Sequence, residues 1–202
     1  METAPFLRLG RVTSTQDVAA TLPIGSVVVA EEQTAGRGRQ GRRWEAAPGS
    51  ALLASFVMAP HRLASIAAGV AAAEACGARL KWPNDLLLDG RKLGGILVEA
   101  KPDRAVIGIG INLLAAPAGA ARLERDREKL LDELHRALRR WLEAPPAAIV
   151  ERWCSLSDTL GRRVRVDLGG ETVEGVASGL AADGALLVDG RRIVAGDVVQ
   201  LR

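Results

Sequence analysis

Runs of consecutive apolar residues, several of them rich in β-branched side chains, divide the first half of the chain into short buried segments. Residues 26–31 and 51–58 are the first two runs, and both are typical of buried strands. The Ala-rich stretch 62–76 predicts a helix packed closely through small side chains. Further strand-like runs occupy residues 79–82, 86–88, 92–100 and 105–113, with a hairpin signal at Asp89-Gly90 between the second and the third. The pattern predicts a mixed α and β domain.

In the second half of the chain the apolar residues take helical spacing. Between residues 121 and 142 leucines recur on one face while Arg, Glu and Asp occupy the other, which predicts an amphipathic helix. Pro145-Pro146 ends that helix, and a shorter one extends to about residue 156. Near the N-terminus, the hydroxyls of Ser14-Thr15 can cap a further short helix.

Beyond Gly161 the sequence pattern changes to short β-strand-like runs separated by glycine-containing turns. Such closely spaced runs predict five strands folded into a small barrel. We place the boundary near residues 158–161, so that the expected domains span residues 1–159 and 160–202.

Composition narrows the class of protein. The 202 residues are 48% hydrophobic and 25% charged, as is ordinary for a soluble globular protein. A net charge of +3 is too small to indicate nucleic-acid binding over the whole surface. Cys76 and Cys154 lack the spacing of a metal or redox site, so we expect buried free thiols. Without a leader-like N-terminus or an apolar run of about 18 residues, we expect a cytoplasmic protein.

A Gly/Arg-rich segment, residues 36–42, follows the first apolar strand and precedes Trp44. Its glycines allow backbone amides to approach a ligand closely, and each guanidinium can hold anionic oxygens through two donors. By itself the segment fits a phosphate site and a solvated or RNA-binding loop equally well.

Lys92 provides a second cation, directly after the hairpin signal and before Gly94 and Gly95. An ammonium fixed there can neutralise a carboxylate or phosphate, although a surface lysine beside a turn is the commoner case. Combined with the arginines of residues 36–42, it predicts a site for two anionic groups, as activation of a carboxylate by ATP requires. The chain lacks the consensus of a P-loop.

Five segments occur in the order and spacing of biotin protein ligases: residues 14–16, 33–44, 81–85, 91–99 and 110–112. The resemblance covers residues 6–160, and the terminal β segment resembles the family's small SH3-like domain. It implies an α+β fold: a mixed-sheet catalytic domain with packed helices, like that of biotin/lipoyl ligases and class II aminoacyl-tRNA synthetases, and a small C-terminal SH3-like β-barrel.

The resemblance also implies a two-step reaction. Biotin and MgATP give biotinyl-5′-AMP and pyrophosphate, and a lysine of a biotin carboxyl carrier domain, part of a biotin-dependent carboxylase, then takes the biotinyl group. The chain leaves no room for the N-terminal helix-turn-helix domain of some members, so we expect a ligase that binds neither nucleic acid nor membrane, as a monomer or homodimer.

Residue roles carry over by position. Lys92, Arg39 and Arg37 are the implied catalytic residues, with Lys92 at the reacting carboxyl and phosphate oxygens. The implied biotin-binding residues are Ser14, Thr15, Gln16, Gln33, Gly36, Arg37, Lys92, Gly94 and Gly95. Gln16 stands where the family commonly has asparagine, which makes its contact less secure.

The implied ATP and adenylate site uses much of the Gly/Arg segment. Its residues are Arg37, Gly38, Arg39, Arg42, Trp44, Asn84, Asp85, Lys92 and Asn112, with Asp85 also a candidate ligand for Mg²⁺. Trp82 is expected to form a wall. We expect the segment to be mobile when the site is empty and ordered over the intermediate, because an acyl adenylate hydrolyses if water reaches it.

Two other functions are open to the sequence. A lipoate or octanoate ligase or transferase would share the fold, although residues 36–42 and 81–85 favour biotin. A nucleic-acid-binding module would need stacking aromatics, and the chain has no tyrosine, two phenylalanines and four dispersed tryptophans.

Overall fold

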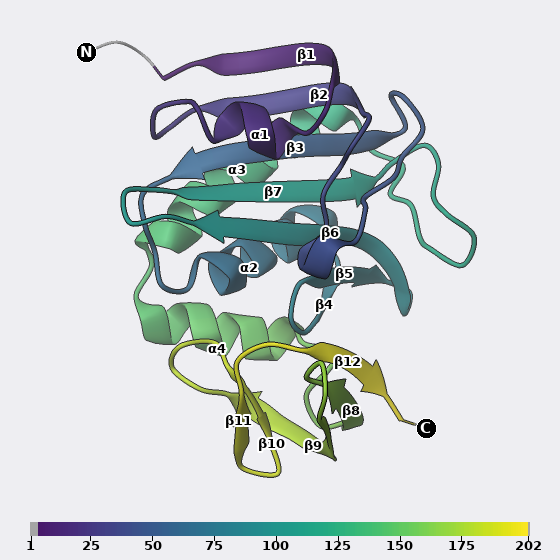
Figure 1. Cartoon of the computed structure of the whole chain (residues 1–202), viewed down its shortest axis with the longest axis vertical. Coiled ribbons are helices and arrows are strands. Elements are labelled where there is room, and N and C mark those ends of the chain that lie inside the picture. Colours follow the sequence, from purple (N-terminus) through teal and green to yellow (C-terminus); the bar gives the residue numbers. More distant parts are fainter. Residues whose placement is uncertain (1–3, 202) are drawn as a thin grey trace.

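The computed structural model describes residues 4–201 and contains two sheets, one large and one small (Figure 1). In the large sheet the strand order is β1-β2-β3-β7-β6-β5-β4, with β1 parallel to β2 and every other neighbouring pair antiparallel. Its strands are β1 (Phe6–Val12), β2 (Val27–Gln33), β3 (Ala51–Met58), β4 (Arg79–Lys81), β5 (Asp85–Leu88), β6 (Arg91–Ala100) and β7 (Ala105–Asn112). The sheet is therefore mixed, as the resemblance implied.

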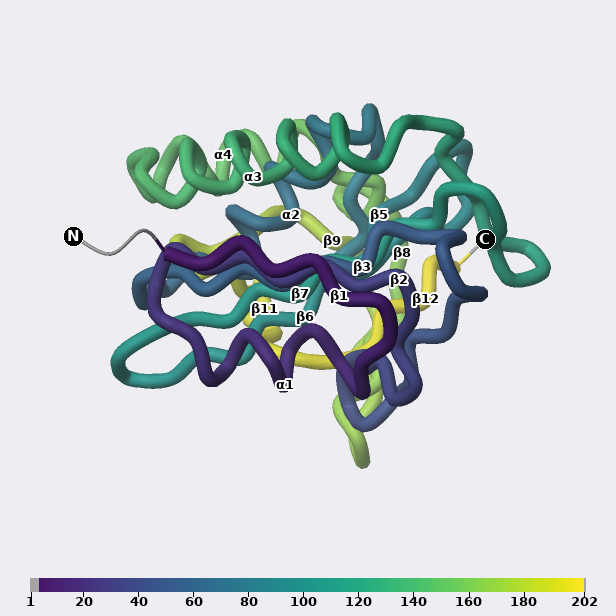
Figure 2. Tube along the Cα trace, turned by 90° about the horizontal axis from the view of Figure 1, so that it is seen from above, coloured from purple at the N-terminus to yellow at the C-terminus, as the bar shows by residue number. Residues whose placement is uncertain are grey.

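Helices cover the two faces of this sheet unequally (Figure 2). The helices α2 (Ala64–Cys76), α3 (Arg127–Glu143) and α4 (Pro146–Leu156) lie on one face, and the short α1 (Thr15–Ala19) lies on the other. The main core fills the space under α2 and α3, while Ala19, Val28, Val57 and Val106 form a smaller cluster under α1. Because alternate residues of a strand point to opposite faces, the apolar runs of β2 and β3 serve both cores.

Helix α2 is buried on nearly every side, which its composition permits. Eleven of its 13 residues are buried, most of them alanines, so the sheet and the other helices can approach closely. The helix ends at Gly77, whose φ of 63° is left-handed and whose amide donates to Ala73 and Glu74 carbonyls. The expected helix at residues 62–76 is confirmed within two residues.

The small sheet has the order β11-β10-β9-β8-β12 and is antiparallel throughout. Its strands are β8 (Arg163–Asp167), β9 (Thr172–Leu180), β10 (Leu186–Val188), β11 (Arg191–Ile193) and β12 (Asp197–Gln200). Within residues 4–201 the end strands β11 and β12 do not pair with each other, so the expected small barrel is not closed. The single strand expected over residues 193–201 is split at Gly196, and the two short pieces lie at opposite ends of the sheet.

The loop between α4 and β8 joins the small sheet to the large one. The Asp158 amide donates to the Leu80 carbonyl at 2.7 Å, and the Trp82 amide donates to Thr159 Oγ1 at 2.9 Å. From the other side the Trp82 indole donates to the Gly184 carbonyl at 3.2 Å. The predicted boundary at residues 158–161 falls in this loop, and the small sheet lies beneath α4 (Figure 1).

One strand was missed by the sequence analysis, and two of its expectations need correction. Strand β1 was not predicted, because its residues alternate between exposed and half-buried positions and carry two arginines. Helix α3 begins at Arg127 rather than near 121, because Asp126 caps it by accepting from the Lys129 amide at 2.8 Å. Cys76 is buried, and burial raises the pKa of its thiol to about 12, but Cys154 is only half-buried.

No helix among residues 4–201 has the length and apolarity to cross a bilayer.

Candidate active site

A cavity of about 440 Å³ lies on the α1 face of the large sheet. Its floor is formed by β3, β6 and β7, and its roof by residues 36–44, which we call the lid. The lid descends in front of β7 and β6 toward β12 (Figure 1). Asp197, Val198 and Val199 of β12 complete the wall, so the small sheet contributes directly to the cavity.

One end of the cavity, which we call the α1 end, is a network of neutral groups from buried Ser14, Thr15 and Ser55 and half-buried Gln33. Ser14 caps α1 by accepting from the Gln16 amide. Gln33 Oε1 accepts from the Thr15 amide at 2.7 Å, from its hydroxyl at 3.0 Å and from the Ser14 hydroxyl at 3.4 Å. The Thr15 and Ser55 hydroxyls are 2.8 Å apart. The carbonyl oxygen of Gln33 is fully engaged, so its Nε2 donors are left for a ligand.

Gln16 lies beside this network and faces two strands. Its Nε2 donates to Glu99 Oε2 at 2.9 Å and lies 3.4 Å from the Val106 carbonyl. Its Oε1 is buried and has no hydrogen-bond partner within the described part of the chain. A Cβ at Gly108 would approach that oxygen to 2.8 Å, so a glycine is required for the amide to lie there.

The lid is a tight hairpin held by its own backbone. The Gly38 amide donates to the Arg42 carbonyl at 2.7 Å, and the Trp44 amide donates to the Gly36 carbonyl at 2.9 Å. A Cβ at Gly36 would collide with the Trp44 carbonyl oxygen. Gly36 therefore serves the close approach of the two limbs and does not line the cavity.

The four lid arginines differ in their partners, and Arg43 donates only to the Thr34 carbonyl, at 3.0 Å. Arg37 pairs with Glu99 at 2.9 Å and with Asp17 at 3.0 Å, and Arg42 pairs with Asp197 of the small sheet at 2.7 Å. Arg39 forms no ion pair with the described residues and has only a 3.4 Å contact with Asn84 Oδ1. Burial lowers the pKa of Arg39, partly offset by the charges of Asp197 and Asp85. Among Arg37, Arg39 and Arg42, Arg39 is thus the one whose guanidinium has donors left for a ligand.

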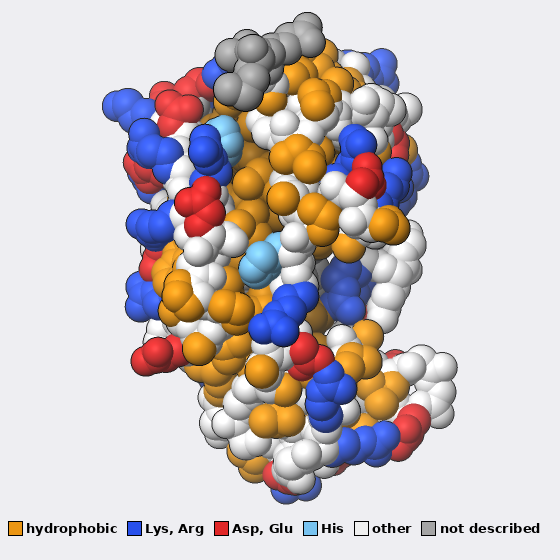
Figure 3. All heavy atoms as spheres, turned by 90° about the vertical axis from the view of Figure 1, so that its left-hand side faces the viewer, with side chains coloured by type: hydrophobic (Ala, Val, Ile, Leu, Met, Phe, Trp, Pro, Cys, Tyr) orange, Lys and Arg blue, Asp and Glu red, His pale blue; other side chains and the backbone are white. Residues whose placement is uncertain are grey.

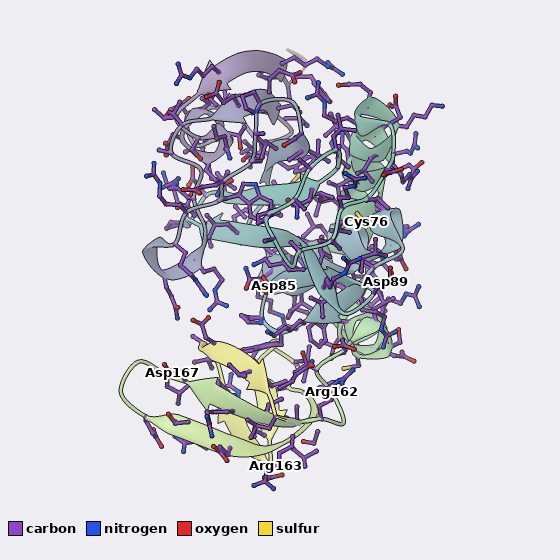
Figure 4. All side chains as sticks on the ribbon, turned by 90° about the vertical axis from the view of Figure 1, so that its right-hand side faces the viewer. Cys76, Asp85, Asp89, Arg162, Arg163 and Asp167 are labelled. Carbon is purple, nitrogen blue, oxygen red and sulfur yellow. The ribbon has the colours of Figure 1, made fainter. Side chains whose placement is uncertain are left out.

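Lys92 lies at the other end of the cavity, which we call the lid end. It is the second residue of β6. Its ammonium lies 2.7 Å from Asp85 Oδ1, and its side chain is 47% exposed. In Figure 4, Asp85 lies toward the centre of the molecule while Asp89 lies at the hairpin turn. A register shift between Leu86 and Leu87 places Lys92 opposite Leu87.

Trp44 lies flat on the glycines of β6 and β7. A Cβ at Gly110 would come within 2.6 Å of the indole, and one at Gly95 within 3.5 Å. The indole Nε1 is buried without a partner in residues 4–201. Behind the ring a second hollow of about 660 Å³ is lined by Lys92, Asn112 and residues 117–120. Trp44 and Lys92 border both spaces.

Most predicted site residues meet in these two spaces. The main cavity is lined by Ser14, Thr15, Gln16, Gln33, Arg37, Gly38, Arg39, Arg42, Trp44, Asn84, Asp85, Lys92 and Gly95. Asn112 borders the second hollow, with its Nδ2 donating to the Ala121 carbonyl at 3.0 Å. Gly94 lines neither, because a Cβ there would lie 2.5 Å from the Gly110 carbonyl oxygen. The wall from β12 was missed, since a short strand in the second domain carries no sequence signal of what it faces.

Comparison with known proteins places this arrangement in a family. Residues 8–113 match the family model of the biotin/lipoate A/B protein ligase family, and residues 159–200 match the biotin protein ligase C terminal domain. The biotin--[acetyl-CoA-carboxylase] ligase of Mycobacterium tuberculosis is 38% identical, over 88% of this chain and 80% of the relative. The chain belongs to the biotin protein ligase family. The corresponding ligase of Paracoccus denitrificans is 32% identical, over 90% of this chain and 93% of the relative.

The fold of a solved biotin protein ligase agrees over the whole chain. The Aquifex aeolicus enzyme, in complex with biotin and ATP, superposes with a TM-score of 0.85 at 26% identity and covers 98% of this chain and 99% of its own. Since both sheets are included, the small sheet belongs to the ligase architecture as much as the lid does. The described residues hold no group of three or more His, Cys, Asp or Glu side chains that could cage a metal ion.

Proposed function

We propose that the protein is an ATP-dependent biotin protein ligase that activates biotin as biotinyl-5′-AMP and transfers the biotinyl group to a lysine of a biotin carboxyl carrier domain. The observation that carries the proposal is the polarity of the cavity: buried neutral hydrogen-bonding groups at the α1 end, and Lys92 with Arg39 at the lid end. Biotin has the same polarity, with a neutral ureido ring at one end and a carboxylate at the other.

The α1 end is suited to the ureido group. The Nε2 donors of Gln33 can serve the ureido oxygen, and the Ser14 and Thr15 hydroxyls, whose hydrogens point to Gln33 Oε1, can accept beside it. Burial makes these contacts selective, because a polar group left without a partner in a dry site costs about 1–3 kcal/mol. A lipoyl dithiolane, which has no oxygen to accept from these donors, would impose that cost.

The lid end is suited to the chemistry. A carboxylate oxygen of biotin attacks the α-phosphorus of ATP, and the bond to the bridging oxygen breaks with release of pyrophosphate. Lys92 lies where it can neutralise both approaching anions, and Arg39 offers its unused donors to the phosphate oxygens. Asp85 can meet the Mg²⁺ that enters with ATP, because such an ion needs few protein ligands beyond the phosphates.

The second hollow is suited to the nucleoside. Trp44 and Asn112 both line that space, so an adenine there would have an aromatic ring and an amide side chain beside it. Placing adenine there would bring the α-phosphate to Lys92, which borders both spaces.

Transfer to the carrier completes the reaction. The carrier lysine amine attacks the carbonyl carbon of the mixed anhydride, the bond to the phosphate oxygen breaks, and AMP leaves as the amine loses a proton. The lid and β12, joined through Arg42 and Asp197, would keep water from the anhydride until the carrier arrives. We place the domain boundary near residues 158–161, so that the domains span residues 1–159 and 160–202 and the second domain contributes one wall of the site.

A direct test is to incubate the protein with biotin, MgATP and a biotin carrier domain and to measure the carrier's mass. We expect a gain of one biotinyl group, which depends on ATP and is lost when the carrier lysine is changed to arginine. An unchanged mass, or modification with lipoate but not biotin, would refute the proposal. A nucleic-acid function finds no support on the face in Figure 3, where basic and acidic side chains are interspersed.

A further inference from the structure

Glu99, near the end of β6, joins the α1 end of the cavity to the lid through one oxygen atom. Its Oε2 accepts from Gln16 Nε2 at 2.9 Å and from the Arg37 guanidinium at 2.9 Å. Both donors line the cavity, whereas Glu99 itself does not and is 38% exposed. Its carboxylate therefore acts on the site only through these two neighbours.

The contact with Gln16 fixes which way its amide points. A carboxylate can only accept, so the donor Nε2 must face Glu99, and the reversed amide would set two oxygens against each other. In the observed orientation Oε1 lies against Gly108 in the cavity wall, buried and without a donor among the described residues. An acceptor left in this state, in the wall of a ligand-sized cavity, is suited to an N–H from a ligand.

The contact with Arg37 restrains the lid. Arg37 lies in the first limb of the hairpin and is held between Glu99 and Asp17. The Arg37 guanidinium is paired with two carboxylates, whereas Arg39, two residues later in the lid, is paired with none among the described residues. The first limb is thus anchored over the α1 end while Arg39 stays available.

We propose that Glu99 is a positioning residue for biotin: it turns the Gln16 amide so that Oε1 accepts a ureido N–H, and it anchors the lid over the ring through Arg37. This inference rests on the proposed function. It assigns Gln16 the recognition of an N–H donor, a group that biotin has and a dithiolane lacks. It also separates Arg37, which anchors the lid, from Arg39, which faces the reacting phosphates.

The test is calorimetric titration of biotin, without ATP, into the parent chain, Glu99→Ala and Glu99→Gln. We expect Glu99→Ala to weaken biotin binding at least tenfold while kcat at saturating biotin changes less than threefold. Glu99→Gln should lie between, since its amide oxygen still accepts from Gln16 but lacks the charge that holds Arg37. Glu174→Ala is the matched control, because Glu174 is equally exposed, lies on a strand and pairs with Arg165 at 2.7 Å in the small sheet.

A double-mutant cycle with Gln16→Leu separates positioning from a general structural effect. If Glu99 acts through Gln16, the loss of biotin-binding free energy caused by Glu99→Ala should be less than a third as large in the Gln16→Leu background as in the parent. An equal cost in both backgrounds, or Glu99→Gln and Glu99→Ala variants that bind biotin as the parent does, would overturn the inference. A parent chain that binds no biotin would overturn the proposed function and this inference with it.

Discussion

The two ends of the cavity are held together by opposite kinds of polar contact. At the α1 end, the groups are neutral and buried: Ser14, Thr15 and Ser55 are each no more than 3% exposed. At the lid end, the contacts are ion pairs open to solvent, such as Arg42 with Asp197, whose side chains are 58% and 41% exposed.

This difference separates a rigid end from an adaptable one. Exposed ion pairs are worth about 0–1 kcal/mol, so a phosphate can replace them at little cost. A buried network loses more when one member is removed, because its partners stay in place without hydrogen bonds. We therefore expect the α1 end to be ready before the ligand arrives and the lid end to rearrange around it.

Removal of the Lys92 charge should have the largest effect. We expect Lys92→Ala to lower adenylate formation by about 10²–10³-fold, because it removes the cation at the reacting centre. Pyrophosphate release from ATP measures this step, and biotin binding without ATP should weaken far less, because the ureido contacts at the α1 end remain. Lys101→Ala, an exposed lysine at the end of β6, is the control. Near-normal pyrophosphate release by Lys92→Ala would reject the assigned role.

Loss of the Arg39 side chain should open the lid end without blocking the chemistry there. We expect Arg39→Gly to form adenylate but release it about tenfold to a hundredfold faster, because the unpaired guanidinium no longer holds the phosphate. Biotinylation of a bystander protein without a carrier domain measures the escape. Arg39→Lys retains a charge and should leak less. Retention of the intermediate at the parent rate would show that Arg39 does not close the site.

The sequence predicts the adaptable end better than the rigid one. Arg37, Arg39 and Lys92 can be picked out because their cations lie beside glycines within segments that match the family in order and spacing. Ser55, by contrast, lies within an apolar run and gives no sign that its hydroxyl meets Thr15, because that contact depends on how β3 lies beneath α1. Local patterns report chemistry carried by one segment and miss contacts that only the assembled sheet creates.

The same limit applies to the fold. The interior strands and α2 can be predicted from the sequence because each corresponds to a distinct run of apolar residues. Strand β1 lies at the edge of the sheet with an alternating pattern, and β12 is separated from β11 only by residues 194–196. The contact of Asp197 with Arg42 spans 155 positions in sequence, so no local pattern could have shown that the small sheet closes the cavity.

Removal of one hydroxyl should test the rigid end. We expect Thr15→Val to weaken biotin binding about tenfold, since about 1.4 kcal/mol corresponds to that factor and one hydrogen-bonding group of the buried network is lost. The KM for ATP should stay within twofold, because that substrate binds at the other end. Calorimetry with biotin and steady-state kinetics with ATP give the two values. Equal losses for both substrates would mean that the two ends are not independent.

Neutralising Asp197 should have a smaller effect than Thr15→Val. We expect Asp197→Asn to speed release of the adenylate about two- to fivefold, because it removes a solvent-exposed ion pair that joins the lid to β12. Added salt should also speed release of the adenylate from the parent, and it should change the release rate of the variant less. Asp167→Asn, on the neighbouring β8, is the control. A change in melting temperature of more than a few degrees would show that the pair holds the fold and not the lid.

The smallest effect is expected from acid, at a charge cluster remote from the cavity. Glu74 of α2 accepts from the Trp141 indole at 2.9 Å and from Arg152 at 2.8 Å, and Arg140 is also paired with it. Burial alone would raise the pKa of Glu74, but these hydrogen bonds and charges hold it below its ordinary value of 4.5. A lowered pKa in the folded state means that the stabilisation is complete above that ordinary value and is lost as the pH falls below it.

We expect Glu74→Gln to lower the free energy of unfolding by about 1 kcal/mol at pH 7 and to flatten its decline between pH 5 and pH 3. Urea titrations at several pH values measure both. Biotin affinity at pH 7 should not change, because Ser14, Thr15 and Gln33 carry no titratable group and lie on the opposite face of the sheet from α2. A fall in biotin affinity in Glu74→Gln would show that the rigid end depends on helix packing behind the sheet as well as on its own network.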